Sequence, residues 1–171
     1  MQLEYDKARL SLKVLITLFL VFVGVGYVLG LVNIHNNVGL SYTGVVVHYR
    51  GEGDEAVPPE FALAKLVHEH HVHLFSLSML FLIIGVLFSF TKLPEFFKTL
   101  FVAAPFFGMF LDFAGLWLTV FSSPAFGWLT VIFGGFMAVS FFMLIARPLY
   151  EMWVLPIWEL KWHHNVPWYL K

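Results

Sequence analysis

The most unusual segment of this sequence is residues 68–73, which read HEHHVH and place four imidazoles within six positions. Imidazole nitrogen ligates haem iron, copper, zinc and non-haem iron, so the segment predicts a type of ligand before it predicts a metal. A helix turns by about 100° per residue, so His70 and His73 share one face while His68 and His71 share another. A haem or metal site would therefore use one or two of these histidines and complete its coordination from elsewhere.

Two histidines outside this segment can supply the missing ligand. His35 follows the first apolar run, and His48 lies in the polar stretch after it. We expect His73 or His71 to ligate a haem from one side and His35 or His48 from the other, with His70 as a further candidate. The same residues could instead bind copper, zinc or iron, or form an interfacial helix start that contacts only water or a partner protein.

Asp112 lies about halfway along an apolar run and is the second candidate for chemistry. An ionisable residue inside a membrane is costly and usually faces the bundle interior or a hydrated path. A carboxylate that accepts a hydrogen bond from an imidazole would fix its tautomer and strengthen it as a ligand. Asp112 is therefore expected to orient a histidine, to exchange protons as at a quinol site, or to serve as a neutral hydrogen-bonding residue. Gly108 and Gly115 lie near it in helical projection and leave room on that face.

The elements that must hold these residues are membrane-spanning helices. Of the 171 residues, 60% are hydrophobic and 12% charged, a balance that a soluble domain of this size could not hide from water. The chain has no cysteine, which excludes disulfides, thiolate ligands and iron–sulfur clusters. Four apolar runs reach the length of about 20 residues that crosses a bilayer: 13–32, 67–91, 100–121 and 126–146. The sequence predicts an all-α, single-domain integral membrane four-helix bundle.

The positive charges predict how this bundle is oriented. Lys and Arg in short flanks gather on the cytoplasmic side of a membrane. With the N-terminus inside, eight of the ten Lys and Arg residues are cytoplasmic, and only Arg50 and Lys65 lie outside. Both termini are therefore expected in the cytoplasm and the loop 33–65 outside, together with every histidine except His163 and His164. The scattered cations and the net charge of −1 exclude a nucleic-acid surface.

Three further patterns concern packing and the ends of the spans. Residues 44–49 could form a short strand, whose partner another subunit would supply. Pro148 is expected to end the fourth helix, and the tail 148–171, with its four tryptophans, to lie along the cytoplasmic interface. Small residues four positions apart predict close helix packing or a docking face for another subunit. These pairs are Gly26 and Gly30, Ala104 and Gly108, and Gly134 and Ala138.

Four short patterns resemble uncharacterised bacterial four-helix inner-membrane proteins, and the resemblance covers most of the chain: HYRG at 48–51, HVHLF at 71–75, Asp112, and PLYEMW at 148–153. It singles out His48, His71, His73 and Asp112 but implies no activity. A looser likeness is to small membrane cytochrome b subunits, which pass electrons between the quinone pool and periplasmic redox partners. Those subunits often carry histidines at both membrane faces for two haems. The spans here offer them only at the outer face, so we expect one haem at most.

Together these features predict a subunit of a bacterial respiratory electron-transfer complex, rather than a stand-alone enzyme, in the inner membrane. One b-type haem near the periplasmic face would relay electrons between quinol and a periplasmic redox partner, with Asp112 as orienting group or proton acceptor. Two alternatives stay open. The chain could be a cofactor-free anchoring subunit that binds larger membrane or periplasmic redox subunits, or a periplasmic-facing copper- or zinc-binding membrane protein.

Overall fold

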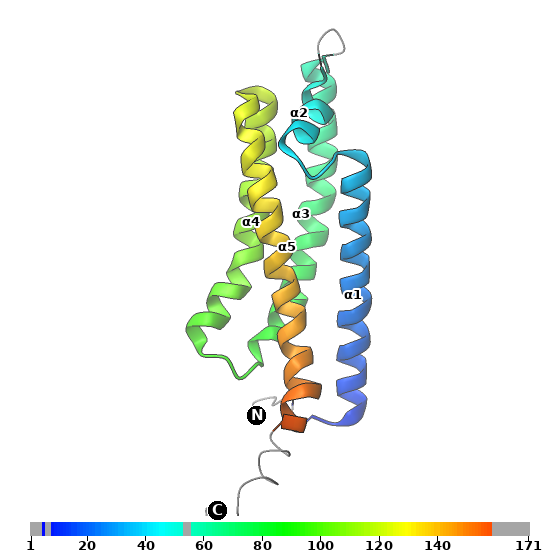
Figure 1. Cartoon of the computed structure of the whole chain (residues 1–171), viewed down its shortest axis with the longest axis vertical. Coiled ribbons are helices and arrows are strands. Elements are labelled where there is room, and N and C mark those ends of the chain that lie inside the picture. Colours follow the sequence, from blue (N-terminus) through cyan, green and yellow to red (C-terminus); the bar gives the residue numbers. More distant parts are fainter. Residues whose placement is uncertain (1–4, 6–7, 53–55, 159–171) are drawn as a thin grey trace, which may run out of the picture.

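The computed structural model describes residues 5, 8–52 and 56–158, and this part of the chain is helical without any strand (Figure 1). The helices are α1 (Leu10–Asn37), α2 (Tyr42–Arg50), α3 (Pro59–Ser89), α4 (Glu95–Phe121) and α5 (Gly127–Leu149), with the 3-10 turn η3 (Pro124–Phe126) and the π-helical turn η4 (Tyr150–Val154). Four helical segments are long and apolar enough to cross a membrane: α1, α3, α4 and the stretch from Pro124 to Trp158. The predicted all-α bundle of four spans is confirmed.

The four long helices run up and down, so the start of α1 and the end of α5 lie at the same end of the bundle (Figure 1). Helix α2 and the start of α3 lie at the opposite end, which we call the α2 end. Each long helix extends beyond the apolar run that predicts it. Helix α3, for example, begins at Pro59 rather than near residue 67, because proline is well suited to the first helical position.

The closest approach of two helices is between α4 and α5. A Cβ added at Gly108 would lie 2.9 Å from Met137 Cβ, and one added at Gly115 would lie 2.8 Å from Thr130 Oγ1. Only glycine fits at such separations. In contrast, a Cβ at Gly26 or Gly30 on α1 would meet nothing within 4 Å. The four-residue spacing of small residues therefore marks a packed face on α4 but an open face on α1.

A mainly apolar core fills the bundle between its middle and the end opposite α2. Its centre consists of side chains that are 0% exposed and come from α1, α3 and α5: Leu20, Phe81, Ile84, Phe88, Phe141 and Leu144. A smaller cluster at the α2 end joins Val45 and Tyr49 of α2 to Leu66 of α3 and Leu116 of α4. The bundle therefore has its larger apolar core in the half away from α2 and a smaller one beneath α2.

The strand predicted at 44–49 is wrong, since these residues form most of helix α2. The hydroxyl of Ser41 accepts a hydrogen bond of 3.1 Å from the Gly44 amide and caps the helix. A Cβ at Gly44 would lie 2.3 Å from the Val38 carbonyl oxygen, so the tight entry requires glycine. A helix satisfies its own backbone, whereas a strand needs a partner, so packing overrides the β-propensity of the three valines.

The sequence suggests that the fourth span ends at Pro148, but in the structure the span continues beyond this residue. Helix α5 includes this proline and continues through the π-helical turn Tyr150–Val154 as far as Trp158. Proline lacks an amide hydrogen and crowds the preceding turn, and a wider π-turn accommodates such a defect without ending the helix. The predicted interfacial tail lies, from residue 159 onwards, outside the described residues.

Candidate functional site

Helix α2 is held against α3 by two neighbouring polar contacts. Lys65 Nζ lies 2.5 Å from His48 Nε2, and the Tyr49 hydroxyl donates a hydrogen bond of 2.7 Å to Glu69 Oε2. The Lys65 ammonium also lies over the Tyr49 ring, 4.9 Å from its centroid. Lys65 and Glu69 are four residues apart and so share one face of α3. Two consecutive side chains of α2 therefore engage one turn of α3.

The next residue, Arg50, ties α2 to α4. Its guanidinium donates a hydrogen bond of 3.1 Å to the backbone oxygen of Thr119, in the last turn of α4. A cation at this position is favourable because the last carbonyls of a helix carry partial negative charge. Gly51 then leaves the helix with a φ of +76°, a conformation that favours glycine. The HYRG pattern at 48–51 thus encodes the attachment and the end of α2.

These contacts set the protonation of the α2 residues. Burial, and then the neighbouring Lys65 ammonium, lower the pKa of His48 below its ordinary 6.5. Burial, and then the hydrogen bond to Glu69, raise the pKa of Tyr49 well above its ordinary range. His48 is therefore a neutral partner for Lys65, and the Tyr49 phenol keeps its proton.

His70 is the histidine of the 68–73 segment that packs against α4. The indole nitrogen of Trp117 donates a hydrogen bond of 2.9 Å to His70 Nδ1, and the Phe113 ring centroid lies 4.1 Å from that of His70. Because Nδ1 accepts, the proton of the neutral ring belongs on Nε2, which is buried without a partner among the described residues. His70 is thus arranged as a hydrogen-bond donor, and it could ligate a metal through Nε2 only by changing this tautomer.

The remaining candidate histidines are exposed. His68, His71 and His73 lie on the open faces of α3, and His35 lies exposed in the last turn of α1. The His71 ring meets Phe75 edge-on, with centroids 5.3 Å apart. Within the described part of the chain, no three His, Asp or Glu side chains lie close enough together to hold a metal ion. Any ligand at these imidazoles would therefore lie on the surface of this chain.

Asp112 lies on α4 and faces α5. A Cβ added at Gly134 would be 3.7 Å from Asp112 Oδ1, and the Thr130 hydroxyl donates to the Asp112 backbone oxygen at 3.2 Å. Tyr27 of α1 and Tyr49 of α2 lie close enough to interact with Asp112 electrostatically. Among the described histidines, none forms a hydrogen bond with this carboxylate. The residues that Asp112 contacts are therefore on α5, and the two tyrosines lie only within electrostatic range.

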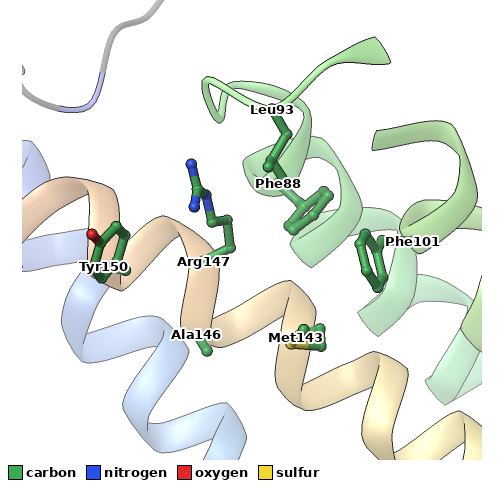
Figure 2. A pocket seen from close by; sticks show the side chains of 7 residues that line it. All are labelled: Phe88, Leu93, Phe101, Met143, Ala146, Arg147 and Tyr150. Atoms are coloured by element: carbon green, nitrogen blue, oxygen red, sulfur yellow. The ribbon is translucent and has the colours of Figure 1, made fainter. Parts of the chain in front are cut away.

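A second polar cluster closes the end of the bundle opposite α2. Glu151, 1% exposed, accepts hydrogen bonds of 2.8 Å from Arg147 Nε and of 2.9 and 2.8 Å from the Lys92 amide. It therefore fastens the α3–α4 connection to the end of α5. Figure 2 shows an adjacent cavity of about 290 Å³, lined by apolar side chains together with Arg147 and Tyr150. No histidine lines this cavity, so it is separate from the predicted haem ligands.

Sequence reasoning missed most of the residues that build the α2 end. It assigned no role to Tyr49, Lys65, Glu69 or Trp117. Lys65 contacts His48 and Trp117 contacts His70, while Tyr49 and Glu69, the neighbours of these two histidines in the sequence, contact each other. One signal was present, because Arg50 and Lys65 are the two cations expected outside the membrane. An isolated cation at that face is well placed to have a specific partner.

Comparison with known proteins supports the membrane assignment. No curated protein and no solved structure matches the chain. A family model described as a transmembrane helical domain, Aq_1264_TM, matches residues 39–156. This match includes α2 to α5 and more than half of the 171 residues. The chain is a multi-pass membrane protein that belongs to this family of transmembrane helical domains.

Proposed function

We propose that this chain is a membrane subunit of a bacterial respiratory electron-transfer complex in the inner membrane. In this proposal the α2 end faces the periplasm. One b-type haem binds at this end and relays electrons between quinol and a periplasmic redox partner. The observation that carries the proposal is the set of exposed imidazoles on α3, His68, His71 and His73, at the end of the bundle that also holds His35. Exposed imidazoles in a membrane-spanning helix are costly unless a ligand or a partner covers them.

The donor set suits haem better than a bare metal ion. A structural zinc site takes four protein ligands and a catalytic one takes three, but the described residues bring no three suitable side chains together. Haem needs only one or two axial ligands from the protein and, when bound, supplies a one-electron couple. His73 or His71 from α3 and His35 from α1 would hold it. His48 is the weaker candidate, because Lys65 lies 2.5 Å from its Nε2.

Two other polar residues, His70 and Asp112, would position a quinone and accept a proton, respectively. His70 presents a buried N–H, and Trp117 fixes its ring, so it would donate to an acceptor such as a quinone carbonyl if the aromatic side chains around it part. Asp112 lies deeper and would accept a proton released on quinol oxidation. Neither role requires the histidine–carboxylate hydrogen bond that the sequence suggests.

The reduced-minus-oxidised optical spectrum of the purified full chain tests this function. We expect sharp haem bands, and we expect the double variant His71→Ala, His73→Ala to lose them while circular dichroism stays unchanged. His68→Ala is the matched control, because His68 is exposed on the same helix, and it should keep the bands. Full haem content in the double variant would place the ligands elsewhere. Copper or zinc without haem would favour the metal-binding alternative.

An anchoring subunit without a cofactor is the second candidate. Helix α1 has 28 residues, of which only Ile16 and Leu20 are buried. In the membrane the exposed side of this helix meets lipid or another subunit, and the open glycines Gly26 and Gly30 leave that side flat. Absence of both haem and metal, together with co-purification of redox subunits that Gly26→Leu abolishes, would favour this function.

A further inference from the structure

Among the described residues, none forms an ion pair with Asp112. From α5 it meets Gly134 and Thr130, which are uncharged. From α1 and α2, Tyr27 and Tyr49 lie within electrostatic range. An intramembrane carboxylate without a cation must be neutral or hydrated, so Asp112 is suited to take up and release a proton.

The route from Asp112 to the α2 end is short and polar. Asp112 lies nine residues before Phe121, the last residue of α4, which corresponds to about 14 Å at 1.5 Å per residue. Tyr49 reaches into this space from α2 and is 7% exposed, and its hydroxyl is hydrogen-bonded to Glu69. Glu69 is only partly buried. Tyr49 packs in one cluster with Leu116, which lies one helical turn from Asp112 toward the α2 end. Tyr49 and Glu69 are therefore polar groups between Asp112 and the surface beside α2.

The opposite route is long and apolar. From Asp112 back to Glu95, the first residue of α4, the helix spans seventeen residues, or about 26 Å. The interior along it is filled by side chains that are 0% exposed, among them Phe81, Ile84 and Phe141. The Tyr27 ring stacks on Phe141, with the ring centroids 4.0 Å apart, and is part of this packed interior. Close-packed apolar side chains leave no room for a water chain on this side.

We propose that Asp112 is a proton-exchange site that opens only toward the α2 end, through the hydroxyl of Tyr49. The step is a proton transfer without redox change. The Tyr49 hydroxyl, which donates to Glu69 in this structure, turns toward Asp112. Its proton then passes through intervening water to the Asp112 carboxylate as the Tyr49 oxygen takes up a proton from water at the α2 surface. The phenol is restored and Asp112 becomes a neutral carboxylic acid, and release runs through the same steps in reverse.

This inference deepens the proposed function, because it assigns a side of the membrane to any proton that quinol chemistry leaves on Asp112. It does not depend on haem. His70 of α3 is another titratable group near this part of α4, and its ring packs on Phe113 and Trp117. Absence of haem bands from the optical spectrum would not contradict proton exchange at Asp112. Absence of proton exchange at Asp112 would not contradict haem binding.

Infrared spectroscopy of the full chain in proteoliposomes tests the proposal. We expect one carboxylic C=O band to disappear in Asp112→Asn, which identifies it. Its hydrogen–deuterium exchange should slow by about tenfold or more in Tyr49→Phe, because the relay hydroxyl is gone. Tyr42→Phe is the matched control, since Tyr42 lies on the same helix but stacks on Trp128, and it should exchange like wild type.

Sidedness is measured separately, so a poorly folded Tyr49 variant cannot decide the outcome alone. Vesicles are oriented by labelling a cysteine at Ala56 in the α2–α3 connection, and the pH is then changed on one side only. The Asp112 band should respond to the side that carries the label. A response to the other side, or unchanged exchange in folded Tyr49→Phe, would overturn the proposal.

Discussion

Replacing Gly115 by alanine should force α4 and α5 apart and destabilise the bundle. The added Cβ would lie 2.8 Å from Thr130 Oγ1, 2.9 Å from Leu129 Cβ and 2.9 Å from the Thr130 nitrogen. Favourable contacts between carbon atoms lie at about 3.5–4.0 Å. Two of the three clashing atoms are a backbone nitrogen and a Cβ, which cannot move away by rotating a side chain. The two helices must therefore separate along the face that also carries Asp112.

The expected cost follows from comparison with Gly26→Ala. Inserting a methyl group into a packed interior costs about 1–3 kcal/mol, whereas alanine gains up to about 1 kcal/mol over glycine in helix propensity. Both variants share the propensity gain, but the Cβ at position 26 meets nothing within 4 Å. The difference between their free energies of unfolding therefore isolates the clash, and we expect Gly115→Ala to be the less stable by about 1–3 kcal/mol.

Unfolding by a denaturing detergent in mixed micelles, followed by circular dichroism, measures this difference. Gly26→Ala should match or slightly exceed the wild type. Equal stability of the two alanine variants would refute the reasoning, because it would mean that α4 and α5 are not in direct contact at this glycine.

Three further results are expected. Glu151→Gln should lower the free energy of unfolding by about 1–3 kcal/mol, since it leaves the partly exposed Arg147 without its carboxylate; unchanged detergent unfolding would contradict this. Because burial and then Lys65 lower the pKa of His48, only the unfolded chain binds this proton just below about pH 6.5, so stability should fall as the pH drops through that range. His48→Gln should flatten that part of the stability curve. In intact cells an impermeant thiol reagent should label a cysteine at Ala56 but not one at the start of α1, and the reverse would invert the topology.

The membrane class and the four spans could be predicted because they depend on averages. A run of about 20 apolar residues is readable without knowing any contact, and all four runs lie within the observed spans apart from the last residues of the run 67–91. The ends of the helices could be predicted less accurately than the spans. The segment 59–66, whose Glu60 and Lys65 interrupt its apolar residues, forms the first turns of α3, and a π-turn carries the chain past Pro148.

The candidate site could be predicted only in part. The histidine segment and Asp112 stand out by residue type, since imidazoles and carboxylates are rare in apolar runs. Their partners do not stand out. Tyr49 reads as an ordinary aromatic residue, and its pairing with Glu69 joins positions twenty residues apart. Which of the histidines turns inward also depends on how α3 is rotated against α4, and a cluster of four imidazoles does not encode that rotation.

The sequence by itself determined that this chain spans a membrane four times and that its unusual polar groups are four clustered histidines and one mid-span aspartate. Burial of apolar side chains is additive along the chain, so composition and run length suffice for that conclusion. Only the tertiary structure decided that α2 is a helix, that His70 alone of the four histidines packs against Trp117, and that Asp112 faces Gly134 of α5. Those outcomes depend on helix rotation and close approach, which two glycines on α4 permit and which no local pattern specifies.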